Sequence, residues 1–466
     1  MIKHPYEVIV IGSGATGGVA ALTFAEKGIR VLVLEAGPQF SAAEAMGSEA
    51  CNMARRMKGI ATGQQRLQAQ HPGYWKANPM LYANEKQYPY TYPPDQPFIW
   101  TQGRQVGGKS LTWGGITLRL SDNEFKASKQ DGYGPEWPIM HKDLDQHYSA
   151  LEKKLKIHGH NDGLSGLPDG HYIDPLPFTS AEKKFAKSIK EKLGVFVIHS
   201  RGFGPHNPSS KNDWPRSSSL GSTLSIALAT GKVEIVSNKM VERIILKGDQ
   251  TRAKGVVVID QLNGQREELC GEVIVLCAST IPTLRILLSS EESVQEKGFT
   301  NPSGDLGCSL MDHISTCRFF TISGANKKVP EVDKELDFAL SGAGSFLIPI
   351  GEKLRGDDNK KFLRNYGLWG AINRFEPPQF LKNFPNTKTG FLIGHGEVLS
   401  NKENRVTLSE KLDRWGIPVP NIQCKWRENE NLMAAHIQKT IDHIIEIAGG
   451  EMLPLQNWSL IRHLLI

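Results

Sequence analysis

The order of apolar and polar residues is most informative in the first fifty positions. Residues 6–11 (YEVIVI) form a short, β-branched apolar run, which is typical of a buried parallel strand. Residues 19–27 (VAALTFAEK) have the composition of a helix that stops at Gly28, and residues 30–34 (RVLVL) form a second apolar strand. The pattern predicts a strand, a glycine-rich turn, a helix and a second strand.

Two later segments have the spacing of amphipathic helices. In Glu182–Lys192 the apolar residues Phe185 and Ile189 recur every four positions among lysines, and Leu193 continues the series. We interpret the lysines as a solvated face, and a weak site for an acidic partner is the alternative. Residues 428–448 show helical spacing too and end at a pair of glycines.

Composition places the chain among soluble globular proteins, with 39% hydrophobic and 22% charged residues. Its 466 residues exceed one ordinary domain, so we expect two or three domains. The net charge of +6 is spread thinly, whereas nucleic-acid-binding proteins concentrate basic residues on one face. Composition therefore argues against a nucleic-acid partner and against collagen-like, coiled-coil and disordered classes.

The six cysteines do not have the spacing of a zinc or redox site, since no two are separated by only two residues. We therefore expect no bound metal. No apolar run reaches the roughly 18 residues that cross a bilayer, and the first residues lack the apolar core of a secretion signal. We expect a cytoplasmic protein without a transmembrane segment.

The glycine-rich turn Gly12–Gly18 carries the first candidate chemistry. Gly12 permits the tight turn, Gly14 lets the backbone approach a diphosphate, and Gly17 lets the helix pack on the strand. The start of the helix attracts phosphate charge, and Glu35 can accept hydrogen bonds from ribose hydroxyls. We predict a dinucleotide site for FAD or NAD rather than NADP. A turn of purely structural purpose is the alternative.

A second glycine cluster occupies residues 103–115 (GRQVGGKSLTWGG). It contains two pairs of glycines, Gly107–Gly108 and Gly114–Gly115, which indicate backbone pressed against a flat or phosphorylated group. A glycine-rich surface loop is the alternative. The two glycine segments together favour a flavin over a nicotinamide cofactor.

These motifs resemble the glucose–methanol–choline (GMC) family of FAD-dependent oxidoreductases, in the family's order and over most of the chain. Thr112 or its neighbours stand where some members carry a histidine linked to the flavin, so the resemblance implies non-covalent FAD. The segments that carry the resemblance are 12–18 with Glu35, 104–115, 227–244, 273–289, 305–313 and 404–418. The cofactor-binding residues that it implies are Gly12, Ser13, Gly14, Ala15, Thr16, Gly17, Gly18, Glu35, Ala36, Arg104, Val106, Gly107, Gly108, Ser110, Thr112, Trp113, Gly114, Gly115, Val241, Cys277, Ala278 and Ser279.

The resemblance also implies a fold. We expect an α/β architecture, in which a discontinuous, Rossmann-like FAD-binding domain carries an inserted antiparallel-sheet substrate domain (α+β). Phe391–Leu399 and Arg405–Leu408 have strand character that suits this antiparallel sheet. The expected division is residues 1–50, 98–135 and 215–315 for the FAD-binding domain, 51–97 for a lid or connecting loop, 136–214 and 316–428 for the substrate-binding domain, and 429–466 for a truncated C-terminal segment.

Residues 72–100 are rich in proline and hold five of the ten tyrosines. Long proline-rich loops inside compact enzymes are often lids or binding loops, so the aromatic rings could stack on a sugar or another flat substrate. A rigid cover that buries its own rings is the alternative. The sequence leaves both interpretations open.

The activity implied by the resemblance is hydride transfer from the CH–OH group of an alcohol or sugar to flavin N5, with an unknown electron acceptor. The family's base is a histidine, paired with a histidine or an asparagine, in a segment that follows the counterpart of residues 428–448. We do not find that segment after Gly450, and His463 has the wrong context, so we assign no catalytic residue. We expect His313 and His395 to be structural.

Two alternatives to this oxidoreductase stay open. The first is a catalytically impaired flavin-binding protein, because the C-terminal His/Asn pair is absent from the sequence. The second is an NAD-dependent dehydrogenase that uses the first glycine turn alone.

Overall fold

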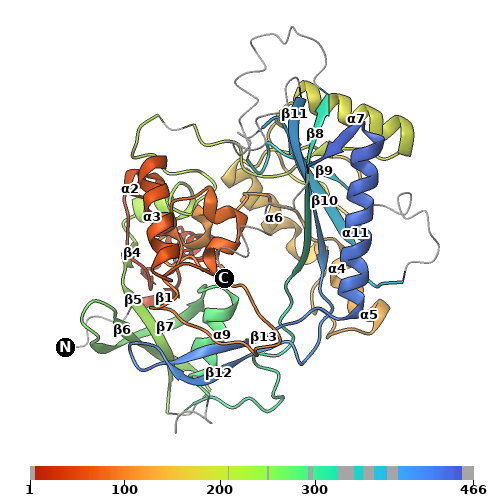
Figure 1. The fold of residues 1–466 in the computed structure, drawn as a ribbon. Coiled ribbons are helices and arrows are strands. Elements are labelled where there is room, and N and C mark those ends of the chain that lie inside the picture. The colour runs from red at the N-terminus through yellow and green to blue at the C-terminus, as the bar shows by residue number, and fades with distance from the viewer. Residues whose placement is uncertain are drawn as a thin grey trace.

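Two six-stranded sheets organise the molecule, one in each of two lobes (Figure 1). The computed structural model describes residues 6–207, 209–248, 251–291, 298–323, 341–349, 361–374 and 387–453. The predicted fold class is confirmed, since a sheet with parallel strands lies in one lobe and an antiparallel sheet in the other.

The first sheet has the strand order β4-β2-β1-β7-β6-β5. β1 pairs in parallel with both β2 and β7, and β2 pairs in parallel with β4. The pairs β7–β6 and β6–β5 are antiparallel. The strands of this sheet are β1 (Tyr6–Ile11), β2 (Val31–Leu34), β4 (Val233–Val236), β5 (Lys239–Leu246), β6 (Ala253–Asp260) and β7 (Arg266–Leu276).

Helices cover both faces of the first sheet. α1 (Ala15–Ala25) and α8 (Thr223–Ala229) share one apolar core with the strands, and α9 (Thr280–Leu288) contributes to the core on the other face. The predicted strand, turn, helix and strand are confirmed, but the helix begins at Ala15, earlier than the predicted range. Its first turn therefore directly follows Gly14, so its free N–H groups lie at the glycine turn.

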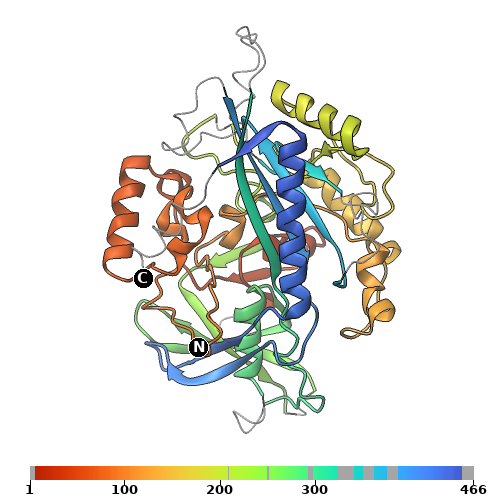
Figure 2. The same ribbon diagram turned by 45° about the vertical axis from the view of Figure 1, so that its right-hand side comes forward.

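The second sheet is antiparallel throughout, with the order β14-β8-β11-β10-β9-β3. α7 (Ser180–Leu193) and α11 (Glu428–Ile447) pack on one of its faces (Figure 2). Both predicted amphipathic helices are thereby confirmed, with Phe185 and Ile189 fully buried. The strands are β3 (Ile198–His199), β8 (His313–Ser323), β9 (Phe346–Ile348), β10 (Tyr366–Ile372), β11 (Thr387–Glu397) and β14 (Gly450–Met452).

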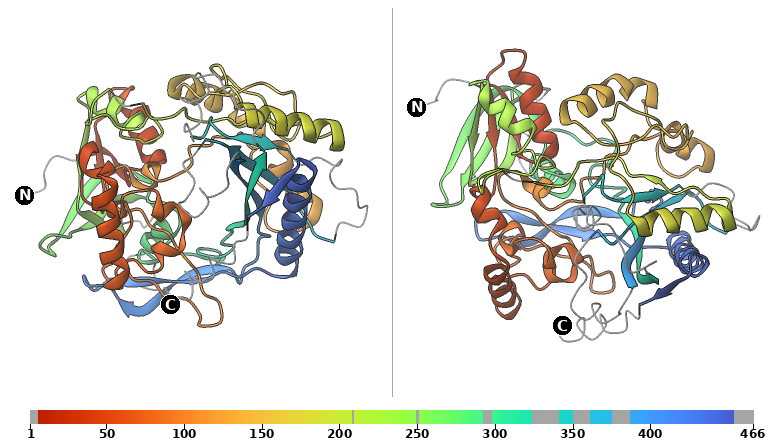
Figure 3. Two further views of the ribbon diagram at one scale, coloured as in Figure 1. Left: turned by 45° about the horizontal axis from the view of Figure 1, so that its top comes forward. Right: turned by 90° about the horizontal axis from the view of Figure 1, so that it is seen from above.

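One strand expected in the antiparallel sheet lies elsewhere. β12 (Arg405–Leu412) pairs with β13 (Pro418–Gln423) in a separate two-stranded ribbon, so the expectation for Arg405–Leu408 is wrong. The ribbon reaches from the foot of α11 to the lobe of the first sheet (Figure 3). There Val406 and Ile422 are buried against α9, because the apolar side of the ribbon finds its partner on that helix.

Short helices connect these elements. In the segment expected as a lid or connecting loop, the ring of Tyr74 is fully buried and makes edge contacts with the rings of Trp75 and Tyr82. This packing favours a rigid cover, and the domain boundaries themselves stay predictions. The connecting helices are α2 (Ala42–Met46), α3 (Glu49–Ala61), η1 (Gln68–Gln70), η2 (Pro72–Trp75), η3 (Pro79–Leu81), η4 (Gly108–Leu111), α4 (Asp122–Phe125), α5 (Ala127–Asp131) and α6 (His141–Leu155).

Candidate functional site

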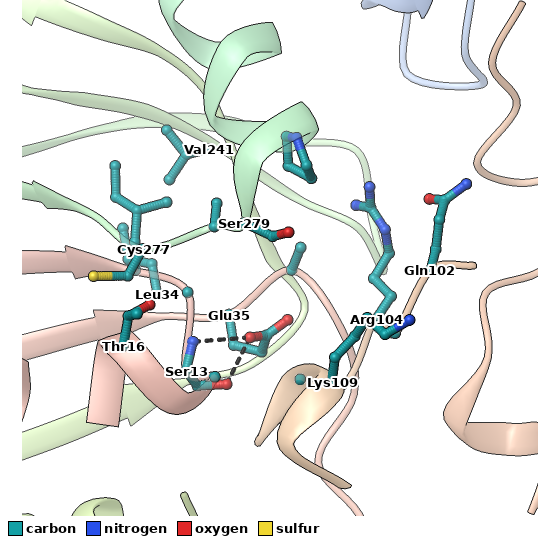
Figure 4. A pocket seen from close by; sticks show the side chains of 18 of the residues that line it. Ser13, Thr16, Leu34, Glu35, Gln102, Arg104, Lys109, Val241, Cys277 and Ser279 are labelled. Carbon is teal, nitrogen blue, oxygen red and sulfur yellow. Dashed lines mark hydrogen bonds between the residues drawn. The ribbon is translucent and has the colours of Figure 1, made fainter. Parts of the chain in front are cut away.

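A cavity of about 350 Å³ lies where the parallel strands β1, β2 and β7 end (Figure 4). The carboxyl ends of parallel strands meet at one edge of a sheet, and ligands bind in the crevice there. Fifteen of the residues predicted from the sequence line this cavity: Gly12, Ser13, Gly14, Ala15, Thr16, Glu35, Ala36, Arg104, Gly108, Ser110, Trp113, Val241, Cys277, Ala278 and Ser279.

The three key glycines of the first turn meet different steric demands. Gly12 has φ +101°, and a Cβ at this residue would overlap the carbonyl oxygen of Cys277. A Cβ at Gly17 would overlap the carbonyl oxygen of Gly12, so the helix packs directly on the turn. A Cβ at Gly14 would meet no heavy atom within 4 Å, since it would point into open space. Gly12 and Gly17 are thus required by the fold, whereas Gly14 leaves room for a ligand.

Glu35 follows β2 and is buried at the cavity wall, with 7% of its surface exposed. Its Oε2 accepts hydrogen bonds from Ser13 N at 3.1 Å and Ser13 Oγ at 2.6 Å, and its Oε1 accepts one from Gly37 N at 2.8 Å. Burial raises the pKa of Glu35 above its ordinary value, and these three donors oppose the shift. The carboxylate therefore braces the glycine turn and still faces the cavity.

Ser13 joins the two glycine segments. Its Oγ accepts a hydrogen bond from Gly107 N at 3.0 Å, and its carbonyl oxygen accepts one from Ser219 Oγ at 2.8 Å. Ser219 N in turn donates to Ser110 Oγ at 2.9 Å. These bonds hold the turn after β1 and the cluster at residues 103–115 next to each other in the wall of one cavity, although they lie about ninety positions apart in the sequence.

The other predicted residues stand behind the cavity wall or beside it. Gly18 packs against the side chain of Thr223, and Val106 is buried in the core that α1 shares with the sheet. The positive φ of Gly107 lets the chain turn into η4. The predicted residues that do not line the cavity are Gly17, Gly18, Val106, Gly107, Thr112, Gly114 and Gly115.

Several residues of the cavity wall were not predicted from the sequence, and three of them are cationic: Lys109, Lys239 and Arg285. Lys109 lies inside the second glycine cluster, so its position in the sequence was a usable signal. Arg285 lies on α9, and no sequence pattern distinguishes it from a solvent-facing arginine. Figure 4 shows Arg104, Gln102 and Lys109 on one side of the view and Cys277 with Thr16 on the other.

The charges of the cavity suit an anionic ligand. Arg104, Lys109 and Arg285 line the wall, while the acid Glu35 is already engaged by three donors. The N-terminus of α1 adds the partial positive charge of a helix dipole. Together with the open space at Gly14, these features fit the diphosphate of a dinucleotide such as FAD.

Two histidines lie on the second sheet, outside this cavity. His395 on β11 is stacked on Trp369, with ring centroids 6.2 Å apart, and lies 5.7 Å from the ring of His313. Burial, assisted by His313, lowers the pKa of His395 to about 4. Neither histidine lines the cavity, and His463 lies outside the described residues.

The family model of the GMC oxidoreductases matches residues 6–315. The chain belongs to the GMC oxidoreductase family. FAD is therefore its expected cofactor, in agreement with the predicted fold class.

Relatives of known activity match along almost the whole chain. The fructose dehydrogenase large subunit of Gluconobacter japonicus is 22% identical over 96% of this chain and 85% of its own length. The 2-methyl-1,2-propanediol dehydrogenase of Mycolicibacterium austroafricanum is 23% identical over 95% of this chain and 80% of its own length. Members of this GMC family are oxidoreductases, so the general class of reaction follows from membership.

Solved structures share the fold. A formate oxidase from Aspergillus oryzae superposes with a TM-score of 0.55 at 14% identity, over 96% of this chain and 81% of that chain. Pyridoxine 4-oxidase from Mesorbium loti gives a TM-score of 0.54 at 15% identity, over 96% of this chain and 83% of that chain. At these identities the likeness concerns the architecture alone.

Within the described residues, no helix has both the length and the apolar character needed to cross a bilayer. The same part of the chain contains no group of three or more histidine, cysteine, aspartate or glutamate side chains arranged to hold a metal ion.

Proposed function

We propose that the protein oxidises the CH–OH group of a small alcohol or sugar, with FAD bound in the cavity at the ends of β1, β2 and β7. The observation that carries this proposal is the open space at Gly14, which lines the cavity and where a Cβ would have no heavy atom within 4 Å. A diphosphate needs such close access to backbone N–H groups. The family membership supports the same cofactor.

Each wall of the cavity has a separate task in this proposal. The N–H groups at the start of α1 bind the diphosphate, and Arg104, Lys109 and Arg285 balance its charge. Glu35 accepts hydrogen bonds from the ribose, as acids at this position do in dinucleotide sites. Trp113 donates from Nε1 to Ser217 O at 2.9 Å, which fixes its ring at the cavity wall.

The chemistry is divided between the cofactor and the chain. When bound, FAD supplies the hydride acceptor. The chain must orient the carbinol carbon, exclude water and provide a base for the hydroxyl proton. We assign that base to no residue, because His313 and His395 do not line the cavity and residues 454–466 lie outside the described part of the chain.

The substrate class is proposed from the relatives. Those matched over most of their length are named for a sugar, fructose, and for a diol, 2-methyl-1,2-propanediol. We therefore propose a sugar or polyhydric alcohol as the donor. A cytoplasmic location stays a prediction.

The test is an anaerobic mixing experiment with the FAD-loaded protein. A panel of sugars, diols and simple alcohols is added, and the flavin absorbance at about 450 nm is followed. Bleaching by one class of donor supports the proposal. A protein that binds FAD but is bleached by no donor would instead be the impaired flavin-binding protein, an alternative that the comparisons do not favour.

A further inference from the structure

Four side chains form a continuous stack that begins at the cavity wall. The guanidinium of Arg104 lies 4.0 Å from the centre of the Tyr88 ring. Tyr88 stacks on Trp415 with centroids 5.6 Å apart and an angle of 25° between the rings, and the guanidinium of Arg414 lies 4.4 Å from the centre of the Trp415 ring. Cation–π contacts of this kind attract a guanidinium to the face of an aromatic ring. The stack therefore holds the guanidinium of Arg104 in place through aromatic residues that do not line the cavity.

The members of the stack come from three distant segments. Arg104 belongs to the second glycine cluster, Tyr88 to the segment before it, and Trp415 to the turn that joins β12 to β13. Gln261, which is 5% exposed, connects them further. It accepts a hydrogen bond from Tyr88 Oη at 2.7 Å through Oε1, accepts one from Arg414 Nη2 at 3.2 Å through its carbonyl oxygen, and donates to Ala36 O.

Trp415 also supports the cavity wall directly. It packs against an apolar cluster that contains Met240, whose Sδ lies 3.5 Å from Arg104 Nη1. Ala36 packs against the same cluster, and both Met240 and Ala36 line the cavity. The indole of Trp415 therefore supports the residues of the cavity wall and, through Met240 and Tyr88, the side chain of Arg104.

The same turn reaches the second arginine of the cavity. Asp413 Oδ2 lies 3.5 Å from Arg285 Nη1, and both side chains are more than nine-tenths buried. Asp413 Oδ1 accepts hydrogen bonds from the backbone N–H groups of Trp415 at 2.9 Å and Ile417 at 3.0 Å, which fixes the carboxylate in the turn. Burial and the nearby charge of Arg104 lower the pKa of Arg285 to about 10, so the group stays protonated near neutral pH.

Two cations that repel each other in a partly dehydrated wall need fixed supports to stay in place. We propose that Tyr88, Trp415 and Asp413 are positioning residues for the cofactor, which hold Arg104 and Arg285 where they balance the charge of FAD. This inference rests on the proposed function. It adds that the β12–β13 turn, which lies outside the cavity wall, sets the affinity for FAD.

The test measures the FAD dissociation constant of the holoprotein by flavin fluorescence after dilution. Trp415→Ala removes the middle of the stack, and we expect FAD to bind about tenfold more weakly. Trp415→Phe keeps an aromatic face for Tyr88 and should restore most of the affinity. Trp137→Ala is the matched control, because Trp137 is exposed and does not line the cavity.

A double-mutant cycle separates positioning from general destabilisation. If Trp415 acts through Arg104, then Trp415→Ala should change FAD affinity less than about twofold in an Arg104→Gln background. An equal loss in both backgrounds would overturn the inference. Should Trp415→Ala fail to fold, Tyr88→Leu takes its place in the cycle, with Tyr88→Phe as the conservative variant that keeps the ring.

FAD binding by the unmutated protein and by Trp415→Ala separates the role of the turn from the role of the cavity. An unmutated protein that does not bind FAD would refute the proposed function itself. Normal FAD binding that is insensitive to Trp415→Ala would refute the support by the turn and leave the cofactor proposal intact. Asp413→Asn, which weakens the contact to Arg285, should act in the same direction as Trp415→Ala.

Discussion

Replacement of Gly14 by alanine tests the cavity with very little disturbance of the fold. Gly14 has φ −66° and ψ −163°, which alanine adopts without strain. The added Cβ would have no heavy atom within 4 Å. The methyl group would therefore stand in the space that a diphosphate must enter, and the FAD-free protein should be as stable as the wild type within about 0.5 kcal/mol.

The expected loss of affinity follows from the hydrogen bonds that the methyl group would disrupt. A charge-assisted bond from a backbone N–H to a phosphate contributes about 1.5–3 kcal/mol. Displacing the diphosphate from one or two such donors at the start of α1 should cost about 3 kcal/mol, which weakens FAD binding by roughly a hundredfold. Calorimetric or fluorescence titration of the FAD-free protein measures this change.

A matched control uses a glycine that is equally free of contacts but remote from the cavity. A Cβ at Gly248, in the turn after β5, also meets no heavy atom within 4 Å, so Gly248→Ala should bind FAD normally. If Gly14→Ala keeps full affinity for FAD, or if it unfolds the protein, the reasoning about this cavity is refuted.

Three further predictions concern stability. Burial raises the pKa of Glu35 above 4.5, so the stability that Glu35 contributes is present below that pH and is lost as pH rises through the raised pKa. The free energy of unfolding of FAD-free Glu35→Gln, measured in urea, should therefore increase relative to that of the wild type as pH rises. A difference that stays constant with pH would contradict this. Burial lowers the pKa of His395 from 6.5 to about 4, so the stability that His395 contributes is present above pH 6.5 and is lost as pH falls through 4. The variant His395→Asn should therefore lose less free energy of unfolding on acidification than the wild type, by at most about 3 kcal/mol. Acid-unfolding curves that are the same for both proteins would argue against this. A Cβ at Gly394 would overlap Ile437 Cγ2, so Gly394→Ala should lower the free energy of unfolding by about 1–3 kcal/mol. Ile437→Ala should lower it by about 2–5 kcal/mol, and thermal or urea unfolding should show the double variant to be less destabilised than the sum of the two. Strict additivity would disprove the contact.

Local sequence patterns predicted the elements whose partners lie close along the chain. β1, the glycine turn, α1 and β2 follow one another within thirty residues, so their roles can be inferred from spacing alone. Glu35 was found in the same way, because it ends the second strand of that unit. The apolar spacing of α7 and α11 also sufficed, since each helix buries a single stripe against the second sheet.

Long-range contacts explain what the sequence did not reveal. Arg405–Leu408 has the pattern of a strand, but the pattern does not say which sheet the strand joins, and the apolar face of β12 is buried against α9. Arg285 lines the cavity and Trp415 packs behind its wall, and only the packed fold brings their separate elements together. The cofactor segments could be predicted from their resemblance to a family because the chain needs glycines at fixed positions there. Supporting residues such as Trp415 can vary with the surrounding packing, so no motif identifies them.

The most direct test of the account is the titration of FAD-free protein with FAD, followed by flavin fluorescence, with a parallel titration by reduced nicotinamide dinucleotide. We expect saturation at one FAD for each chain and no competition from the nicotinamide. Tight nicotinamide binding without uptake of FAD would contradict this expectation, and would favour a dehydrogenase that uses the first glycine turn alone.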